Sequence, residues 1–293
     1  MLDYILIIIG FLWLIFATIT DIKFREVPDW VSYSFVVIGL GTRSIYSILT
    51  YDWVFILYGI AGFLLFFLIG NIMYYTKQWG GGDAKLLMGL GAVFGSYPAS
   101  LLDYFNPNLN IPFILILLIN IIIAGGIYGF GLSLFLAIKN WNKFIKEIKK
   151  LKKEKINISR RNISFFIVIM AVVISFFISD FRYKFLIYLF SFFIILLNYL
   201  FLYLKAIEEV CMYKYVDVNK LTEGDWIVKD VFLRGKKIYK AERLGITKNN
   251  IARLKNSGVK KVLVKEGLPF VPAFLIALII SLIFGNLMAF FPR

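Results

Sequence analysis

Long apolar runs separated by polar stretches are the main pattern along this chain. A helix of about 17 to 25 apolar residues crosses a lipid bilayer. Seven runs of this length lie at about 2–20, 31–49, 53–75, 111–138, 163–179, 185–206 and 269–291. An eighth run, at 84–97, is short for a crossing. The sequence therefore predicts an all-α polytopic membrane protein with seven or eight transmembrane helices.

The positive charges between the runs favour eight helices. Lys and Arg collect at 21–30, 77–85, 139–162 and 205–268, and they are sparse or absent at 50–52, 96–110 and 180–184. If 84–97 crosses the membrane, every rich stretch falls on one side, as cytoplasmic loops require. We therefore predict eight helices with the N-terminus outside. The first run lacks the features of a removable signal peptide, so we expect a retained helix.

Two polar segments stand apart from the apolar runs. Residues 207–268 read as strand, helix and strand, with Thr247 and Gly258 at the two ends of the helix. This pattern predicts a small cytoplasmic α/β insert, which either braces the last helix or binds substrate. Residues 139–162 contain ten Lys and Arg. They form either a basic amphipathic helix on anionic lipid or a solvated extension of the fifth helix.

Composition agrees with a membrane protein and limits its chemistry. Apolar residues make up 60% of the chain, and the net charge of +15 suits cytoplasmic loops near lipid headgroups better than nucleic acid. There is no histidine, which excludes Ser-His-Asp and Cys-His catalysis. A single cysteine, Cys211, makes neither an internal disulfide nor an ordinary zinc site. Carboxylates and lysines remain as acid-base groups, and no cofactor is expected.

Two aspartates lie at helix ends on the same predicted face of the membrane. Asp21 follows the first run, and Asp83 precedes the run at 84–97. If neighbouring helices bring these carboxylates together, the pair shares one proton across neutral pH. The ionised member then activates a water molecule, and the protonated member donates to the scissile carbonyl. The sequence therefore predicts aspartic-protease chemistry.

Three glycines, Gly80, Gly81 and Gly82, come directly before Asp83. Glycine can adopt positive φ values and lets another backbone approach closely. An extended substrate could therefore pair with this turn. The alternative is local: aspartate is a favoured helix cap, and glycines are ordinary turn residues.

The two aspartate stretches together resemble the GxGD aspartyl peptidases that process type IV prepilins and archaeal preflagellins. The first stretch is DIKFREVPD at 21–29, and the second is GGGDAKLL at 80–87, followed by a Gly- and Ala-rich helix. The resemblance covers residues 1 to about 138. It implies a membrane peptidase that removes a short basic leader from a pilin-like or flagellin-like precursor at the cytoplasmic face.

By position in these motifs, the resemblance implies that Asp21 and Asp83 are the catalytic pair. Glu26 and Asp29 would attract basic side chains of the leader, and Lys85 would orient near the pair. Solvation of the two acids and headgroup contact for Lys85 are the alternatives. The chain then divides into a peptidase core, a basic loop, two further helices, the insert and a last helix, at 1–138, 139–162, 163–206, 207–268 and 269–293.

Other interpretations make different predictions. Bacterial prepilin peptidases often carry a cysteine-rich zinc region and methylate their product; nothing like that region precedes the first run here, so we expect no methyltransferase activity. The presenilin-like GxGD proteases also contain a Pro-Ala-Leu motif, and Pro272-Ala273-Phe274 is the nearest match. A transporter or assembly scaffold would need charges deep within several helices. Only Arg43 interrupts these runs in that way.

Overall fold

The computed structural model describes residues 2–233, 235–242 and 245–290. It divides into two compact units. One unit contains residues 1–131, 217–262 and 266–293, and the other contains residues 132–216 and 263–265.

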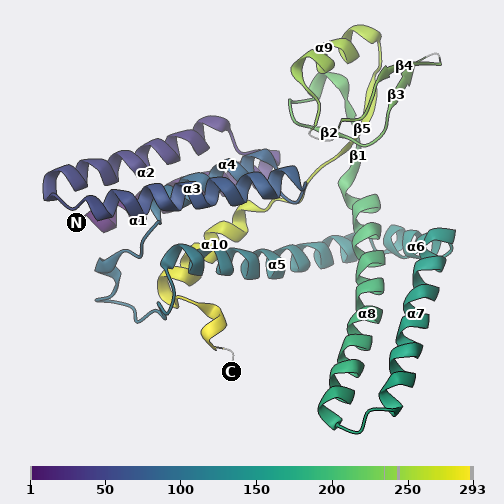
Figure 1. Ribbon diagram of the computed structural model, residues 1–293. Helices are drawn as coiled ribbons and strands as arrows, with labels where there is room; N and C mark the ends of the chain where they lie inside the picture. Colours follow the sequence, from purple (N-terminus) through teal and green to yellow (C-terminus); the bar gives the residue numbers. More distant parts are fainter. Residues whose placement is uncertain (1, 234, 243–244, 291–293) are drawn as a thin grey trace. The chain divides into compact units, whose positions relative to one another are not determined.

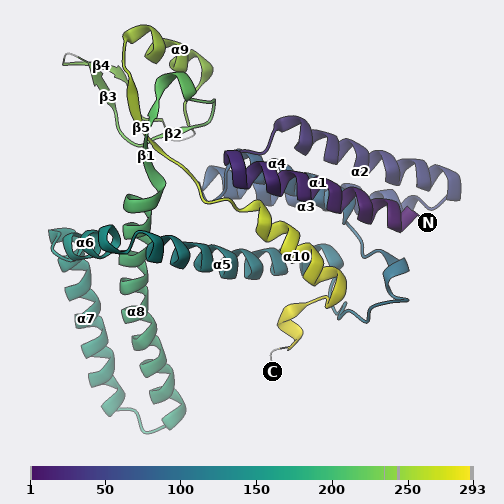
Figure 2. The ribbon, with the colours of Figure 1, turned by 180° about the vertical axis from the view of Figure 1, so that it is seen from behind.

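The first unit is built around four neighbouring helices, which run alongside one another in Figure 1 and in the opposite view of Figure 2. These are α1 (Leu2–Phe24), α2 (Asp29–Thr50), α3 (Trp53–Tyr75) and α4 (Gly81–Val93). The helices α5 (Phe113–Lys139) and α10 (Val271–Ile283) and the short helices η1 (Ala99–Leu101) and η4 (Leu287–Phe290) complete its apolar part. Buried side chains of α1, α2, α4, α5 and α10 form one continuous core.

In the second unit, α7 (Lys155–Phe176) and α8 (Phe181–Ile207) form a helical hairpin (Figure 1). The short helices α6 (Trp141–Leu151) and η2 (Glu208–Met212) adjoin it. Phe144 and Leu151 of α6 are buried together with Ala206 and Ile207 at the end of α8. Residues 139–162 are therefore neither one helix on lipid nor a plain extension of α5, since protein covers the apolar face of α6.

In its described residues, the polar insert contains five short strands, the α-helix α9 and the short helix η3. A three-stranded sheet has the order β1-β5-β2, and β3 pairs with β4 in an antiparallel hairpin. The bounds are β1 (Tyr213–Asp217), η3 (Val218–Lys220), β2 (Trp226–Ile227), β3 (Val231–Leu233), β4 (Lys236–Tyr239), α9 (Lys248–Ser257) and β5 (Lys261–Lys265). As predicted, α9 follows Thr247 and ends at Gly258, which adopts a left-handed φ of 79°. The strands β1 and β4 were not predicted.

Five helices in the described part of the chain are long and apolar enough to cross a membrane, namely α1, α3, α5, α7 and α8. The count of eight crossing helices therefore stays a prediction. The helix α4 has 13 residues and rises about 20 Å, against about 30 Å of bilayer core. Within the run predicted at 269–291, the α-helix α10 has 13 residues. The chain then turns at Gly285, where φ is 73°, before the short helix η4.

The helices α3 and α4 pack with their backbones in contact. A methyl group on Gly91 would overlap the carbonyl oxygen of Gly62, and one on Gly95 would overlap that of Tyr58. Farther along, a methyl group on Gly70 would lie 2.9 Å from the carbonyl oxygen of Ala84. Small residues allow this approach, which is a common way for helices to associate in membranes.

A buried arginine closes the far end of α4. Arg43 in α2 is 1% exposed, and its guanidinium donates hydrogen bonds of 2.8 Å to the carbonyl oxygens of Val93 and Phe55. It also donates to the hydroxyl of Ser96 and lies over the ring of Phe55. Since Val93 is the last residue of α4, Arg43 satisfies a helix-terminal carbonyl that has no partner within the helix.

We predict that Gly91→Ala destabilises the folded protein, because its added methyl group forces the two backbones apart. Overpacking of this kind costs about 1 to 3 kcal/mol. Thermal unfolding of the detergent-solubilised protein measures the effect. Gly126→Ala in α5 is the matched control, since nothing lies within 4 Å of its added methyl group. Equal melting temperatures for the two variants would contradict the close contact.

Candidate active site

Asp21 lies in the last turn of α1. The helix continues to Phe24, and Arg25 then adopts a left-handed φ of 61° that stops it. The helix is four residues longer than the predicted run, which ended at residue 20, so Asp21 is inside its last turn and not just after it. The difference matters because the side chain faces the protein interior, with 5% of its surface exposed.

The Asp21 carboxylate contacts the start of α10, which is distant in sequence. Its Oδ2 atom accepts a hydrogen bond of 2.9 Å from the backbone N–H of Val271. The adjacent Phe270 packs against Trp79 with ring centroids 5.3 Å apart, and Phe274 packs against both rings. The start of α10 is thereby held between Asp21 and the residue that precedes the three glycines.

Asp83 lies in the first turn of α4, which begins at Gly81 rather than at the predicted residue 84. Its Oδ2 atom accepts a hydrogen bond of 3.1 Å from the backbone N–H of Gly80. This contact is the local capping role that the sequence left as an alternative. It uses one carboxylate oxygen and fixes the side chain at the helix start.

The segments that carry the two aspartates meet at Val27 and Gly82. A methyl group on Gly82 would lie 3.2 Å from the Cβ atom of Val27. Asp83 lies outside the five long apolar helices. Burial raises its pKa to about 7, and the neighbouring charge of Asp21 adds to the rise. The contact of Val27 with Gly82 brings together the two segments that carry these carboxylates.

The three glycines serve close packing rather than unusual backbone angles. None of them has a positive φ, although other glycines of the chain do. Gly82 admits Val27, and a methyl group on Gly80 would lie 3.3 Å from the Asp83 carboxylate. Gly81 has more room, since the nearest atom to its added methyl group is 3.6 Å away on Tyr74.

The other predicted site residues, Lys85, Asp29 and Glu26, have hydrogen-bond or ion-pair partners of their own. Lys85 forms an ion pair of 2.6 Å with Asp29 and lies 5.5 Å from the centroid of the Tyr33 ring. Lys85 is thus bound to Asp29 instead of pointing at either catalytic candidate. Glu26 accepts a hydrogen bond of 2.6 Å from the hydroxyl of Thr222 in the polar insert.

An acidic residue of the insert, Asp225, lies near Glu26. Burial raises the pKa of Asp225, and the charges of Glu26 and Glu266 contribute to the rise. Sequence reasoning did not identify Asp225, because nothing in the local pattern connects it with residues 21–29. Val271, Phe270 and Trp79 were missed for the same reason. In the sequence, the only sign of the contacts made by these residues is the change from polar to apolar residues near Val271, where the last apolar run begins.

Paired carboxylates are the chemistry that the sequence predicted for this site. Two carboxyl groups with one proton between them supply a general base and a general acid together. Among the described residues, no group of three or more Cys, Asp and Glu side chains is arranged to hold a metal ion.

Comparison with known proteins points to one family. Residues 8–130 match the type IV leader peptidase family. The segment contains both aspartates and all three glycines. No solved structure matches the chain.

Three curated relatives are preflagellin peptidases of archaea. The protein of Methanocaldococcus jannaschii is 31% identical over 147 residues, and that of Methanococcus voltae is 34% identical over 145 residues. These alignments cover 50% of this chain and 62% and 61% of the relatives. The protein of Methanococcus maripaludis is 32% identical over 114 residues, which are 39% of this chain and 48% of the relative. The matches thus span less than two thirds of each relative.

Proposed function

We propose that this chain, whose residues 8–130 match the type IV leader peptidase family, is a membrane-embedded aspartic endopeptidase. Its substrates would be type IV pilin-like or archaeal flagellin precursors, from which it removes a short basic leader at the cytoplasmic face without methylating the product. The observation that carries this proposal is the contact between Val27 and Gly82, which joins the segment of Asp21 at the end of α1 to the segment of Asp83 at the start of α4.

In the proposed mechanism, Asp83 holds the shared proton and Asp21 is the base. Asp21 takes a proton from a water molecule, which attacks the scissile carbonyl carbon. Asp83 donates its proton to the carbonyl oxygen. The tetrahedral intermediate then collapses: Asp83 takes back a proton from a hydroxyl as the carbonyl re-forms, the C–N bond breaks, and the proton held by Asp21 passes to the leaving amine. The raised pKa of Asp83 supports its role as the acid at neutral pH.

Leader recognition is assigned to the acidic surface beside the pair. Glu26 is exposed, and Asp29 keeps 63% of its side chain exposed despite its bond to Lys85. These carboxylates would attract the Lys and Arg side chains of a leader. We propose that Lys85 orients Asp29 for this contact and that the turn at Gly81 admits the substrate backbone.

We predict that Asp21→Asn and Asp83→Asn each abolish cleavage of a co-expressed precursor while the protein still inserts in the membrane. Asparagine caps a helix about as well as aspartate, so Asp83→Asn removes the ionisable group and keeps the capping contact. Gel mobility of the precursor measures cleavage. Asp180→Asn is the matched control, because Asp180 caps α8 through Arg182 far along the chain and should remain fully active. Undiminished cleavage by either site variant would exclude the proposed pair.

We predict that the cleavage rate falls as the pH rises above about 7. The pKa of Asp83 is raised, so its proton is present below that pH and is lost above it. A single titration of this kind lowers the rate by roughly tenfold between pH 7 and pH 8.5. Initial rates with a purified precursor at constant ionic strength measure the profile. A rate that still increases at pH 9 would contradict the acid role of Asp83.

We predict that Glu26→Gln raises KM for a precursor with a basic leader and changes kcat little, because it weakens attraction equally in the substrate complex and in the transition state. An exposed charge contact of this type changes KM by roughly twofold to fivefold. Replacing the leader's lysines by glutamine should remove the difference between the variant and the unaltered enzyme. Glu223→Gln, at an exposed position paired with Lys248, serves as the control. The same rise in KM with both leaders would contradict leader recognition by Glu26.

A further inference from the structure

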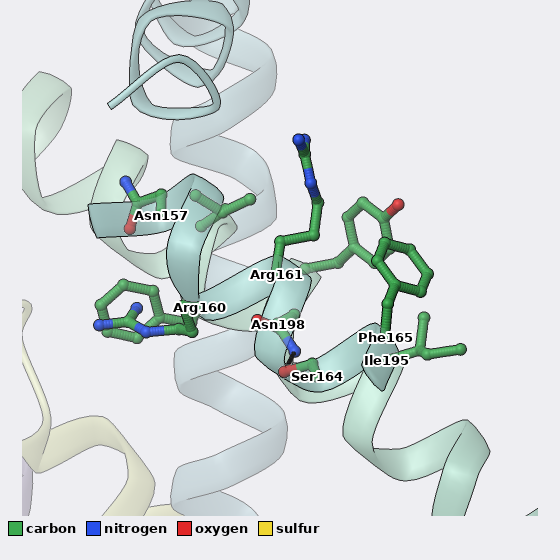
Figure 3. Close-up of a pocket in the computed structure, with 10 residues that line it drawn as sticks. Asn157, Arg160, Arg161, Ser164, Phe165, Ile195 and Asn198 are labelled. Carbon is green, nitrogen blue, oxygen red and sulfur yellow. Dashed lines mark hydrogen bonds between the residues drawn. The ribbon is translucent and has the colours of Figure 1, made fainter. Parts of the chain in front are cut away.

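A groove between α7 and α8 combines charged and apolar walls (Figure 3). The space along it, open solvent included, is about 410 Å³. Asn157, Arg160 and Arg161 line it near the start of α7. Phe165 and Ile195 line it farther from that end, with Ser164 and Asn198 between, where the Asn198 amide donates a hydrogen bond of 2.6 Å to the Ser164 hydroxyl.

The charged end of the groove carries an excess of positive charge. Arg160 stacks on the Phe201 ring at 3.8 Å, which occupies the face of the guanidinium and not the N–H groups at its edge. Arg161 extends from α7 in another direction (Figure 3). Among the described residues, no acidic side chain forms an ion pair with either arginine. Glu154, an acid at the start of α7, already pairs with Lys205.

The two arginines stand where a charged segment meets an apolar one. The chain is basic from Lys149 through Arg161, and from Ile163 onward α7 is almost entirely apolar. The apolar residues of α7 and α8 are mostly exposed, with 6% of each crossing segment buried. Lipid chains therefore cover them in a membrane, and the arginines lie at the depth of the headgroup phosphates.

We propose that this groove binds one anionic phospholipid of the leaflet that faces the basic segment. The N–H groups of Arg161 bind its phosphate through charge-assisted hydrogen bonds, and Arg160, stacked on Phe201, adds positive charge at the same end of the groove. The Asn157 amide takes no part, because it already donates to the Leu151 carbonyl oxygen and to the Glu154 carboxylate. One acyl chain lies along Phe165 and Ile195. The site is separate from the proposed peptidase centre, and its test does not depend on cleavage.

The charge and length of the groove together favour a lipid over a free anion. A phosphate ion would use the arginines alone and leave the apolar wall exposed. A lipid satisfies both ends of the groove, because its acyl chain covers the wall formed by Phe165 and Ile195 while its headgroup meets the arginines. The groove is therefore expected to select its lipid by the charge of the headgroup.

Native mass spectrometry of the full-length protein in detergent tests this proposal. Titration with phosphatidylglycerol and with phosphatidylcholine should show one retained phosphatidylglycerol, preferred by about tenfold, which is the size of effect expected for charge-assisted bonds to phosphate. The double variant Arg160→Gln with Arg161→Gln should lose this preference. Arg161→Gln alone should weaken it, and this variant preserves the stacking of Arg160 on Phe201.

Arg182→Gln is the matched control, because Arg182 lies at the start of α8, the other helix of the hairpin, and pairs with Asp180 at 2.8 Å. It should bind phosphatidylglycerol as the unaltered protein does. Melting temperatures with each lipid show whether a variant is folded. Equal retention of phosphatidylglycerol by the double variant would overturn the proposal. Displacement of the lipid by millimolar inorganic phosphate would also overturn it, since the groove would then bind a free anion.

Discussion

The backbone contact between α3 and α4 is the constraint on which the candidate site depends. Gly62 and Gly91 remove the side chains that would separate the two helices, and Gly70 does the same beside Ala84. Because α4 is fixed along α3, its first turn is fixed too, and Asp83 lies in that turn. The carboxylate is thus positioned by glycine packing well beyond its own neighbours. Packing, rather than burial of apolar area, drives such contacts between helices in lipid.

A short helix inside an apolar core leaves polar backbone groups at its ends, and both ends of α4 are satisfied by side chains. Asp83 accepts from Gly80 at the start, and Arg43 donates to Val93 at the end. An unpaired backbone group in such surroundings costs several kcal/mol. The buried arginine, which resembles a transport residue in the sequence alone, therefore has a structural role that accounts for its burial.

The sequence predicted the apolar elements well where periodicity and length are unambiguous. The bounds of α3 were correct, and α8 differed by a few residues. Errors arose where helices continue through polar residues, because Asp21, Gly81 and Lys155 look like loop residues when burial is unknown. The Lys85–Asp29 pair and the Asp21–Val271 bond were not predictable, since they join segments that are distant in sequence and leave no local pattern. The motif spacing nevertheless drew attention to both aspartates, and their role as a pair stays a prediction.

The hydrogen bond from Val271 to Asp21 has a consequence for where this site begins and ends. The segment that matches the peptidase family stops at residue 130, yet a hydrogen-bond donor to one of its two candidate catalytic carboxylates comes from α10. A chain shortened to the family segment would lose this donor and the Phe270 and Phe274 rings that pack on Trp79. The helix α10 is therefore part of the wall of the candidate site. The site extends beyond the segment that matches the family.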